Sequence, residues 1–251
     1  MARYKVVLAY DGTCFLGYQR QASEKNIRTV QAVFETALRK LTWQGNSVLA
    51  AGRTDTGVHA SGQVVAFNLE WNHNQRALLA ALNANLPQDV AVCSVKSAAP
   101  NFHPRFDATE RTYRYRIFCD NIRNPLRERY SWRVWPEADH KLLDQATTNI
   151  LGTHDFRAFG NPPQPEGTTI RHVFDAVWQI EKNELVFYVT ANAFLYRMVR
   201  RLVGCLVNIG QKRMDVISIQ NMLETGKGSV DLAPPHGLAL IEVKYPADLS
   251  G

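Results

Sequence analysis

The stretch Arg3-Tyr4-Lys5-Val6-Val7-Leu8-Ala9-Tyr10 places Tyr4, Val6, Leu8 and Tyr10 at every second position. Because successive side chains of a β-strand point to opposite faces, this spacing is typical of a strand that buries one face. Asp11-Gly12 follows directly and is a common turn pair. We therefore predict a strand over residues 3–10, and the remaining elements are placed relative to it.

The elements after this strand alternate in a recognisable order. Residues 29–41 carry apolar side chains at helical spacing, with Thr29 as the expected N-cap. Strands are predicted over 47–51, 63–69 and 90–95, and a helix over 75–86 that stops before Pro87. The order strand, helix, strand, strand, helix, strand is that of the split βαβ, or ferredoxin-like, plan.

The same order recurs beyond the irregular stretch 97–104, interrupted by a Pro-rich loop over 161–167. The predicted elements are a strand over 109–118, a helix over 138–151, strands over 170–180 and 185–191, helices over 195–209 and 216–223, and a strand over 239–244. We predict an α+β fold of two ferredoxin-like halves, residues 1–105 and 106–251. Their antiparallel sheets are expected to join side by side, with a cleft at the junction.

Composition excludes several classes of protein. Of 251 residues, 45% are hydrophobic and 21% charged, values usual for a globular protein rather than a disordered or collagen-like one. No apolar run approaches the 18 residues of a membrane span, and residues 1–5 resemble no leader sequence, so we expect a cytoplasmic protein without membrane contact. Cys14, Cys93, Cys119 and Cys205 form no Cys-x-x-Cys pair, so reduced thiols and no metal are expected.

The positive charge is concentrated in two stretches. The net charge is 29 − 23 = +6. Residues 101–135 contain eight arginines against four acids, and residues 195–213 contain five basic residues and no acid. Aromatic residues lie between the arginines, a mixture that suits a nucleic-acid surface. A solvated basic face is the alternative, and charge alone does not decide between them.

The most unusual segment is Ala51-Gly52-Arg53-Thr54-Asp55-Thr56-Gly57-Val58-His59-Ala60-Ser61-Gly62-Gln63. Gly52 and Gly57 have Walker A spacing, but Val58-His59 stands where Lys-Ser or Lys-Thr is needed, which argues against a nucleotide triphosphatase. Asp55-Thr56-Gly57 is also the triplet of aspartic proteases, which need a second such aspartate that this chain lacks. A turn aspartate that satisfies local backbone N–H groups remains the structural alternative.

Several ordered motifs make the chain resemble the TruA family of tRNA pseudouridine synthases. The motifs, spread over almost the whole chain, are Tyr10-Asp11-Gly12-Thr13, Gly17-Tyr18-Gln19, Gly52 to Ala60, Leu82-Asn83, Leu86-Pro87, Phe102 to Ala108, Arg111 to Tyr115, His154-Asp155-Phe156, Asn192 to Leu195, Met198-Val199-Arg200 and Ala233 to Leu238. The departures are mild: Tyr18 stands where Trp is more frequent, and Pro104 where Ala is frequent.

The resemblance implies conversion of uridine to pseudouridine at positions 38, 39 and 40 in the anticodon stem-loop of tRNA. It implies Asp55 as the catalytic carboxylate, Arg200 as its supporting ion-pair partner, and no cofactor. Tyr113 would stack on the target base, although either Tyr113 or Tyr115 could instead belong to the core. Arg53 would hold the target nucleotide outside the RNA stack.

The remaining expectations concern RNA and subunits. We expect Arg114, Arg123 and Arg201 to contact phosphates, and His59 and His103 to contact RNA or to be structural. Family members act as homodimers, so a homodimer bound to tRNA is expected. The alternative is a non-catalytic RNA-binding protein on the same scaffold.

Overall fold

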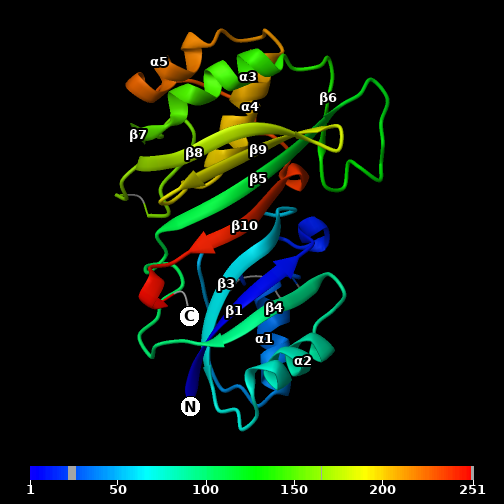
Figure 1. Ribbon diagram of the computed structural model, residues 1–251, viewed down its shortest axis with the longest axis vertical. Coiled ribbons are helices and arrows are strands. Elements are labelled where there is room, and N and C mark those ends of the chain that lie inside the picture. The colour runs from blue at the N-terminus through cyan, green and yellow to red at the C-terminus, as the bar shows by residue number, and fades with distance from the viewer. Residues whose placement is uncertain (22–26, 165, 250–251) are drawn as a thin grey trace. The chain divides into compact units, whose positions relative to one another are not determined.

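The computed structural model describes residues 1–21, 27–164 and 166–249, and the chain divides into two compact units. The first unit comprises Met1–Thr109 with Ala239–Gly251, and the second comprises Glu110–Leu238 (Figure 1). The sequence placed the boundary near residue 105 and assigned 239–251 to the second domain. The last strand instead belongs to the first unit, because it pairs in parallel with a strand of that unit through Ala239 opposite His59 and Leu240 opposite Ala60.

The first unit has the predicted ferredoxin-like order. Its elements are β1 (Ala2–Tyr10), α1 (Val30–Lys40), β2 (Leu49–Ala50), β3 (His59–Leu69), α2 (Gln75–Asn85), β4 (Val90–Ser97) and β10 (Leu238–Lys244), with 3-10 turns at Gly12–Cys14 and Ala247–Leu249. The strand order is β4-β1-β3, with β2 and β10 both paired to β3. β1 runs antiparallel to both β3 and β4 (Figure 1). In this register Val6 lies between Val65 and Val95.

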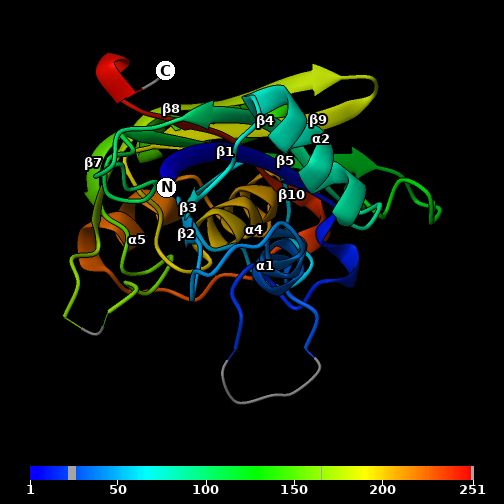
Figure 2. The same cartoon turned by 90° about the horizontal axis from the view of Figure 1, so that it is seen from below.

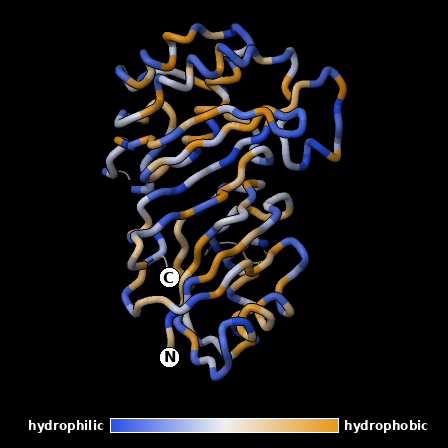
Figure 3. The backbone as a smooth tube through the Cα atoms, in the orientation of Figure 1, coloured by the Kyte–Doolittle hydropathy of each residue, from blue (hydrophilic) through white to orange (hydrophobic). Residues whose placement is uncertain are grey.

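The core of the first unit covers both faces of β3. On one face Phe34 of α1 meets Phe67 edge-on at 5.8 Å between ring centroids, and Tyr4 lies 6.0 Å from the same ring. On the other face Val64 and Ala66 belong to a cluster with Phe102 and Tyr245. Because both faces of β3 are covered, hydrophobic residues line the strands of this unit (Figure 3). The predicted N-cap is confirmed, since the Thr29 hydroxyl accepts a hydrogen bond from Ala32 N.

The second unit contains a mainly antiparallel set of strands with helices packed on it. Its elements are β5 (Glu110–Cys119), β6 (Trp132–Val134), α3 (His140–Thr147), β7 (Gly152–Asp155), β8 (Ile170–Glu181), β9 (Glu184–Ala191), α4 (Met198–Gly210) and α5 (Ile217–Thr225), with 3-10 turns at Thr148–Ile150 and Pro235–Gly237. The order is β6-β5-β9-β8-β7, in which only β6 and β5 pair in parallel. Figure 2 shows α4 and α5 on one side of these strands.

The differences from the predicted elements are local. β6 and β7 were not predicted, and the helix expected over 138–151 is α3 followed by a 3-10 turn. α4 begins at Met198 rather than Leu195, because Arg197 adopts a left-handed conformation with φ 64° at the N-cap. Within the Pro-rich loop 161–167, Pro165 lies outside the described residues.

The packing of α1 on β3 gives a stability prediction. Phe34 is fully buried, so Phe34→Ala should lower the free energy of unfolding by about 3–5 kcal/mol through the cavity it creates. Phe106→Ala is the matched control, because that ring is 73% exposed, and its effect should stay within about 0.5 kcal/mol. Urea unfolding measures both. Equal losses in the two variants would contradict this account of the core.

Candidate active site

Asp55 lies in a short turn between β2 and β3. The backbone N–H of Val58 donates to Asp55 O at 3.1 Å, and Gly57 has φ 76° at the position where a type II turn needs a positive φ. Asp55 is half-buried and Arg53 is exposed. The second glycine of the motif is therefore explained by the backbone of the turn, not by a phosphate-binding loop.

The segment after β1 holds this turn in place. The hydroxyls of Tyr10 and Thr54 lie 2.8 Å apart in the interior, and Tyr18 N donates to Thr54 O at 3.0 Å. Gly57 N donates to Phe15 O at 3.3 Å. The residue directly before Asp55 is thus fixed through both its side chain and its backbone, which restricts where the carboxylate can lie.

Gly12 forms the closest approach to the turn. A Cβ at Gly12 would lie 2.0 Å from Val58 O, so only glycine fits at this position. Its N–H donates to Nδ1 of His59 at 3.0 Å, and His59 is 8% exposed. The same nitrogen lies 3.2 Å from Asp11 Oδ1, so the ring is also close to the carboxylate that follows β1. His59 therefore supports the turn structurally.

His103 also has a structural role. Its Nδ1 accepts from Arg105 N at 3.2 Å and from Phe106 N at 3.3 Å. Its own backbone N–H donates to Asp107 Oδ2 at 2.8 Å. These bonds close the turn 103–107, so the imidazole is occupied in organising its own loop.

In the second unit, Arg200 is 9% exposed and bound to the chain segment before β10. Its Nε donates to Ala233 O at 2.8 Å, and Ala233 N donates to Arg200 O at 3.2 Å. Tyr115 OH donates to the next carbonyl, Pro234 O, at 2.7 Å. Arg200 is therefore a buried arginine held by backbone contacts rather than a solvated side chain.

The two tyrosines of β5 differ in burial. Tyr115 is fully buried, and burial raises the pKa of its hydroxyl well above the usual value, an effect that the charge of Arg200 partly opposes. Tyr113 is half-buried, and its ring packs nearly perpendicular to that of Phe194, with 5.0 Å between the ring centroids. The core position is thus Tyr115, which leaves Tyr113 as the tyrosine with accessible surface.

The three predicted phosphate-binding arginines are not equivalent. Arg123 is 74% exposed in its side chain and pairs with Glu128 at 2.9 Å, which offsets its charge. Arg114 and Arg201 are half-buried, and neither has a carboxylate within ion-pair distance in the part of the chain that the structure describes. The Nε of Arg114 is buried without a partner.

The predicted residues thus fall into two groups. In the first unit, the Asp55 turn brings together Arg53, Asp55 and His59, while His103 lies in a turn of its own. The second unit contains the other predicted residues, which are Tyr113, Arg114, Arg123, Arg200 and Arg201. Sequence reasoning missed the anchoring roles of Tyr10, Tyr18 and Phe194. Each of these residues lies within one of the motifs that resemble the family. The spacing of residues within a motif does not indicate which distant residue each of them contacts.

Comparison with known proteins identifies the family. A family model described as tRNA pseudouridine synthase matches residues 6–107 and 146–246. The chain belongs to this family. The tRNA pseudouridine synthase A of Pseudothermotoga lettingae is 38% identical over 98% of this chain and 100% of its own, and that of Streptococcus agalactiae is 37% identical over 98% and 96%. A solved Cbf5-Nop10-Gar1 complex has a TM-score of 0.35 at 12% identity, covering 81% of this chain and 45% of that one, a likeness too small to inform the fold.

In the described ranges no group of three or more His, Cys, Asp or Glu side chains could hold a metal ion. None of the described helices has the length and hydropathy to cross a membrane. Cys14, Cys93, Cys119 and Cys205 are free.

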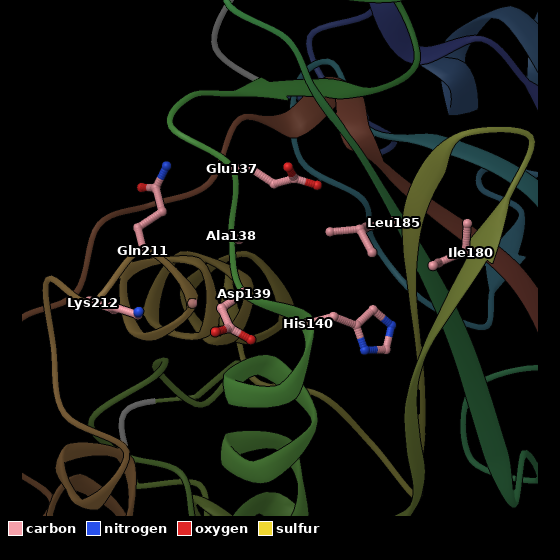
Figure 4. A pocket seen from close by; sticks show the side chains of 9 residues that line it. Glu137, Ala138, Asp139, His140, Ile180, Leu185, Gln211 and Lys212 are labelled. Atoms are coloured by element: carbon pink, nitrogen blue, oxygen red, sulfur yellow. The ribbon is translucent and has the colours of Figure 1, made fainter.

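An open pocket of about 500 Å³ lies in the second unit (Figure 4). None of the predicted site residues lines it. Its lining residues are Glu137, Ala138, Asp139, His140, Ile180, Leu185, Gly210, Gln211 and Lys212. Asp139 is already used there as the N-cap of α3, accepting from Lys141 N.

The anchor of the Asp55 turn predicts an alkaline transition. Burial raises the pKa of Tyr10 to about 12, so the folded state keeps a proton that the unfolded chain releases near pH 10. The corresponding stability is therefore complete below about pH 10 and is lost between pH 10 and 12, by up to about 3 kcal/mol.

Tyr10→Phe removes this titration. Urea unfolding between pH 9 and 12 should show a smaller loss of stability in Tyr10→Phe than in the native protein, with Tyr196→Phe, an exposed ring, as the control. Parallel stability profiles for the native protein and Tyr10→Phe would show that Tyr10 does not titrate in this way.

Proposed function

We propose that this protein converts uridine to pseudouridine at positions 38, 39 and 40 in the anticodon stem-loop of tRNA, with Asp55 as the nucleophile. Family membership makes it an isomerase that acts on tRNA uridine. The observation that carries the residue assignment is the Asp55 turn, whose neighbouring Thr54 is fixed at both its hydroxyl and its carbonyl. We also propose a homodimer that acts in the cytoplasm.

The central requirement of the proposed reaction is a carboxylate held in position to act as the nucleophile. The C1′–N1 glycosidic bond breaks and the base rejoins the ribose through C5, while the proton on C5 is lost and one is gained at N1. The isomerisation needs no external oxidant, reductant or group donor. A carboxylate nucleophile must be ionised, and a nearby guanidinium favours the ionised form. In this proposal Arg200 supplies that positive charge, and its hydrogen bond to Ala233 O supports a fixed orientation.

In this proposal, two further residues position the target base outside the RNA stack. Tyr113 offers a half-buried ring in T-shaped contact with Phe194, and such a ring suits stacking on an extruded base. Arg53 is exposed two residues before Asp55, where a long side chain can occupy the space that the flipped nucleotide leaves. The alternative, a non-catalytic RNA-binding protein, would keep the RNA contacts without turnover.

The proposed function is tested by mapping pseudouridine at single-nucleotide resolution in unmodified tRNA after incubation with the protein. Conversion should occur at positions 38 to 40, and Asp55→Ala should abolish it while leaving tRNA affinity nearly unchanged, because phosphate contacts dominate binding. Glu70→Ala, an exposed carboxylate of the same unit, is the control and should convert at the native rate.

Each contrary result has a distinct meaning. Turnover by Asp55→Ala would remove Asp55 as the nucleophile. Conversion confined to other positions would overturn the assignment to the anticodon stem-loop. Binding of tRNA by the native protein without conversion would favour the non-catalytic alternative.

Arg123 is paired with Glu128, whereas Arg201 has no carboxylate partner in the described part of the chain, so substitutions of the two arginines should change the salt dependence of tRNA binding by different amounts. Each phosphate contact contributes about 0.9 to the slope of log Kd against log salt concentration. Arg201→Gln should lower the magnitude of this slope by about one, whereas Arg123→Gln should change it less, because Glu128 already offsets that charge. Fluorescence anisotropy with labelled tRNA measures the slopes. Equal changes in both variants, or a native slope near zero, would contradict the proposed charged surface.

A further inference from the structure

The turn between β9 and α4, residues 192–197, presents an aromatic ring and a guanidinium at the surface. Tyr196 is 51% exposed. The Cζ of Arg197 lies 4.7 Å from the centroid of the Tyr196 ring, which is the geometry of a cation–π contact. Arg197 is itself exposed. The two side chains therefore form one stacked unit that is open to solvent.

The backbone beneath this pair is fixed from both sides. Leu195 is 4% exposed and Met198 is fully buried, so the residues that flank the pair belong to the core. Tyr196 N donates to Asn161 O at 2.9 Å, and a Cβ at Gly160 would lie 2.7 Å from Leu195 Cβ, so the two segments are in close contact. A ring held on such a backbone loses little conformational entropy when a ligand stacks on it.

The positive charge of Arg197 has no carboxylate partner within the described part of the chain. Arg116 and Arg127 of the same unit differ, since both pair with Glu184, at 2.6 and 3.3 Å. The neighbouring sequence does not offset the charge of Arg197, because residues 195–213 contain no acidic residue. The pair thus combines an exposed π-surface with an unneutralised guanidinium, and a nucleotide offers the complementary base and phosphate.

The turn also connects the pair to the proposed base-stacking residue. Phe194, whose ring packs against that of Tyr113, lies two residues before Tyr196, so the Cα atoms of Phe194 and Tyr196 are at most about 7 Å apart. An RNA that places a base on Tyr113 therefore brings its neighbouring nucleotides to this turn. A protein partner would be expected to use a wider apolar surface around the ring.

We propose that Tyr196 and Arg197 form a binding platform for an unpaired nucleotide that flanks the target uridine, an inference that rests on the proposed function. The base stacks on the Tyr196–Arg197 unit, and the guanidinium binds a phosphate of the same strand. Neither residue takes part in bond breaking. Both position the RNA, so they act on substrate binding rather than on the chemical step.

The experiment uses anticodon stem-loops in which each unpaired loop position in turn carries 2-aminopurine, whose fluorescence is quenched by stacking. At one of these positions the native protein should quench the fluorescence. Tyr196→Ala should abolish that quenching and raise KM for unlabelled tRNA about 5- to 100-fold, with kcat changed little. Tyr196→Phe keeps the ring and should retain both properties.

Arg197→Ala should weaken quenching and binding, and Arg213→Ala provides the matched charge control. Arg213 lies beyond the far end of α4, a helix of 13 residues and so about 20 Å long. Its removal takes away the same charge and should leave the quenching intact. Binding is measured in the Asp55→Ala background, so that turnover does not interfere.

The outcomes separate this inference from the proposed function. Native turnover together with equal quenching and equal KM in the native protein and Tyr196→Ala would overturn the platform alone. Unchanged RNA binding with a lower mass by light scattering in Tyr196→Ala would also overturn it, and would identify the pair as a contact between copies of the chain. Absence of both binding and conversion by the native protein would overturn the platform and the proposed function together.

Discussion

The approach of Gly12 to Val58 is the constraint on which the Asp55 turn depends. Because no side chain separates the two segments, the backbone N–H of Gly12 reaches His59, and Tyr10 and Tyr18 reach Thr54. The end of β1 and the start of β3 therefore form one body that contains the turn. The backbone that carries Asp55, the proposed nucleophile, is held by these contacts, which is the preorganisation that nucleophilic catalysis needs.

The second unit uses a comparable arrangement for its own candidate residues. Arg200 and Tyr115 bind neighbouring carbonyls, those of Ala233 and Pro234, and so tie α4 and β5 to the segment before β10. Removing one such partner would leave a buried polar group unsatisfied, a change more costly than the loss of an exposed hydrogen bond. The buried position of Arg200 thus has a structural basis within its unit, and Tyr113 stays accessible on the same strand as the buried Tyr115.

Much of the fold could be predicted because its long elements have clear periodicity. The alternation over residues 3–10 is β1, and the Thr29 cap starts α1 at Val30. β6 and β7 could not be predicted, since strands of three and four residues contain too few side chains to show a period. The motif of Asp55 was apparent, but its support was not: His59 receives its hydrogen bond from Gly12, 47 residues away, and Arg200 binds a carbonyl 33 residues away. Local patterns contain no information on such partners.

The dependence of turnover on this backbone approach is tested most directly by the single-turnover rate of pseudouridine formation in Gly12→Ala. A Cβ placed 2.0 Å from Val58 O must displace the turn, so conversion should fall by at least about 100-fold in protein that is saturated with tRNA and retains its affinity. Thr13→Ala, at the neighbouring exposed position, should convert at close to the native rate. Conversion by Gly12→Ala at the native rate would contradict the claim that this contact positions Asp55 for the reaction.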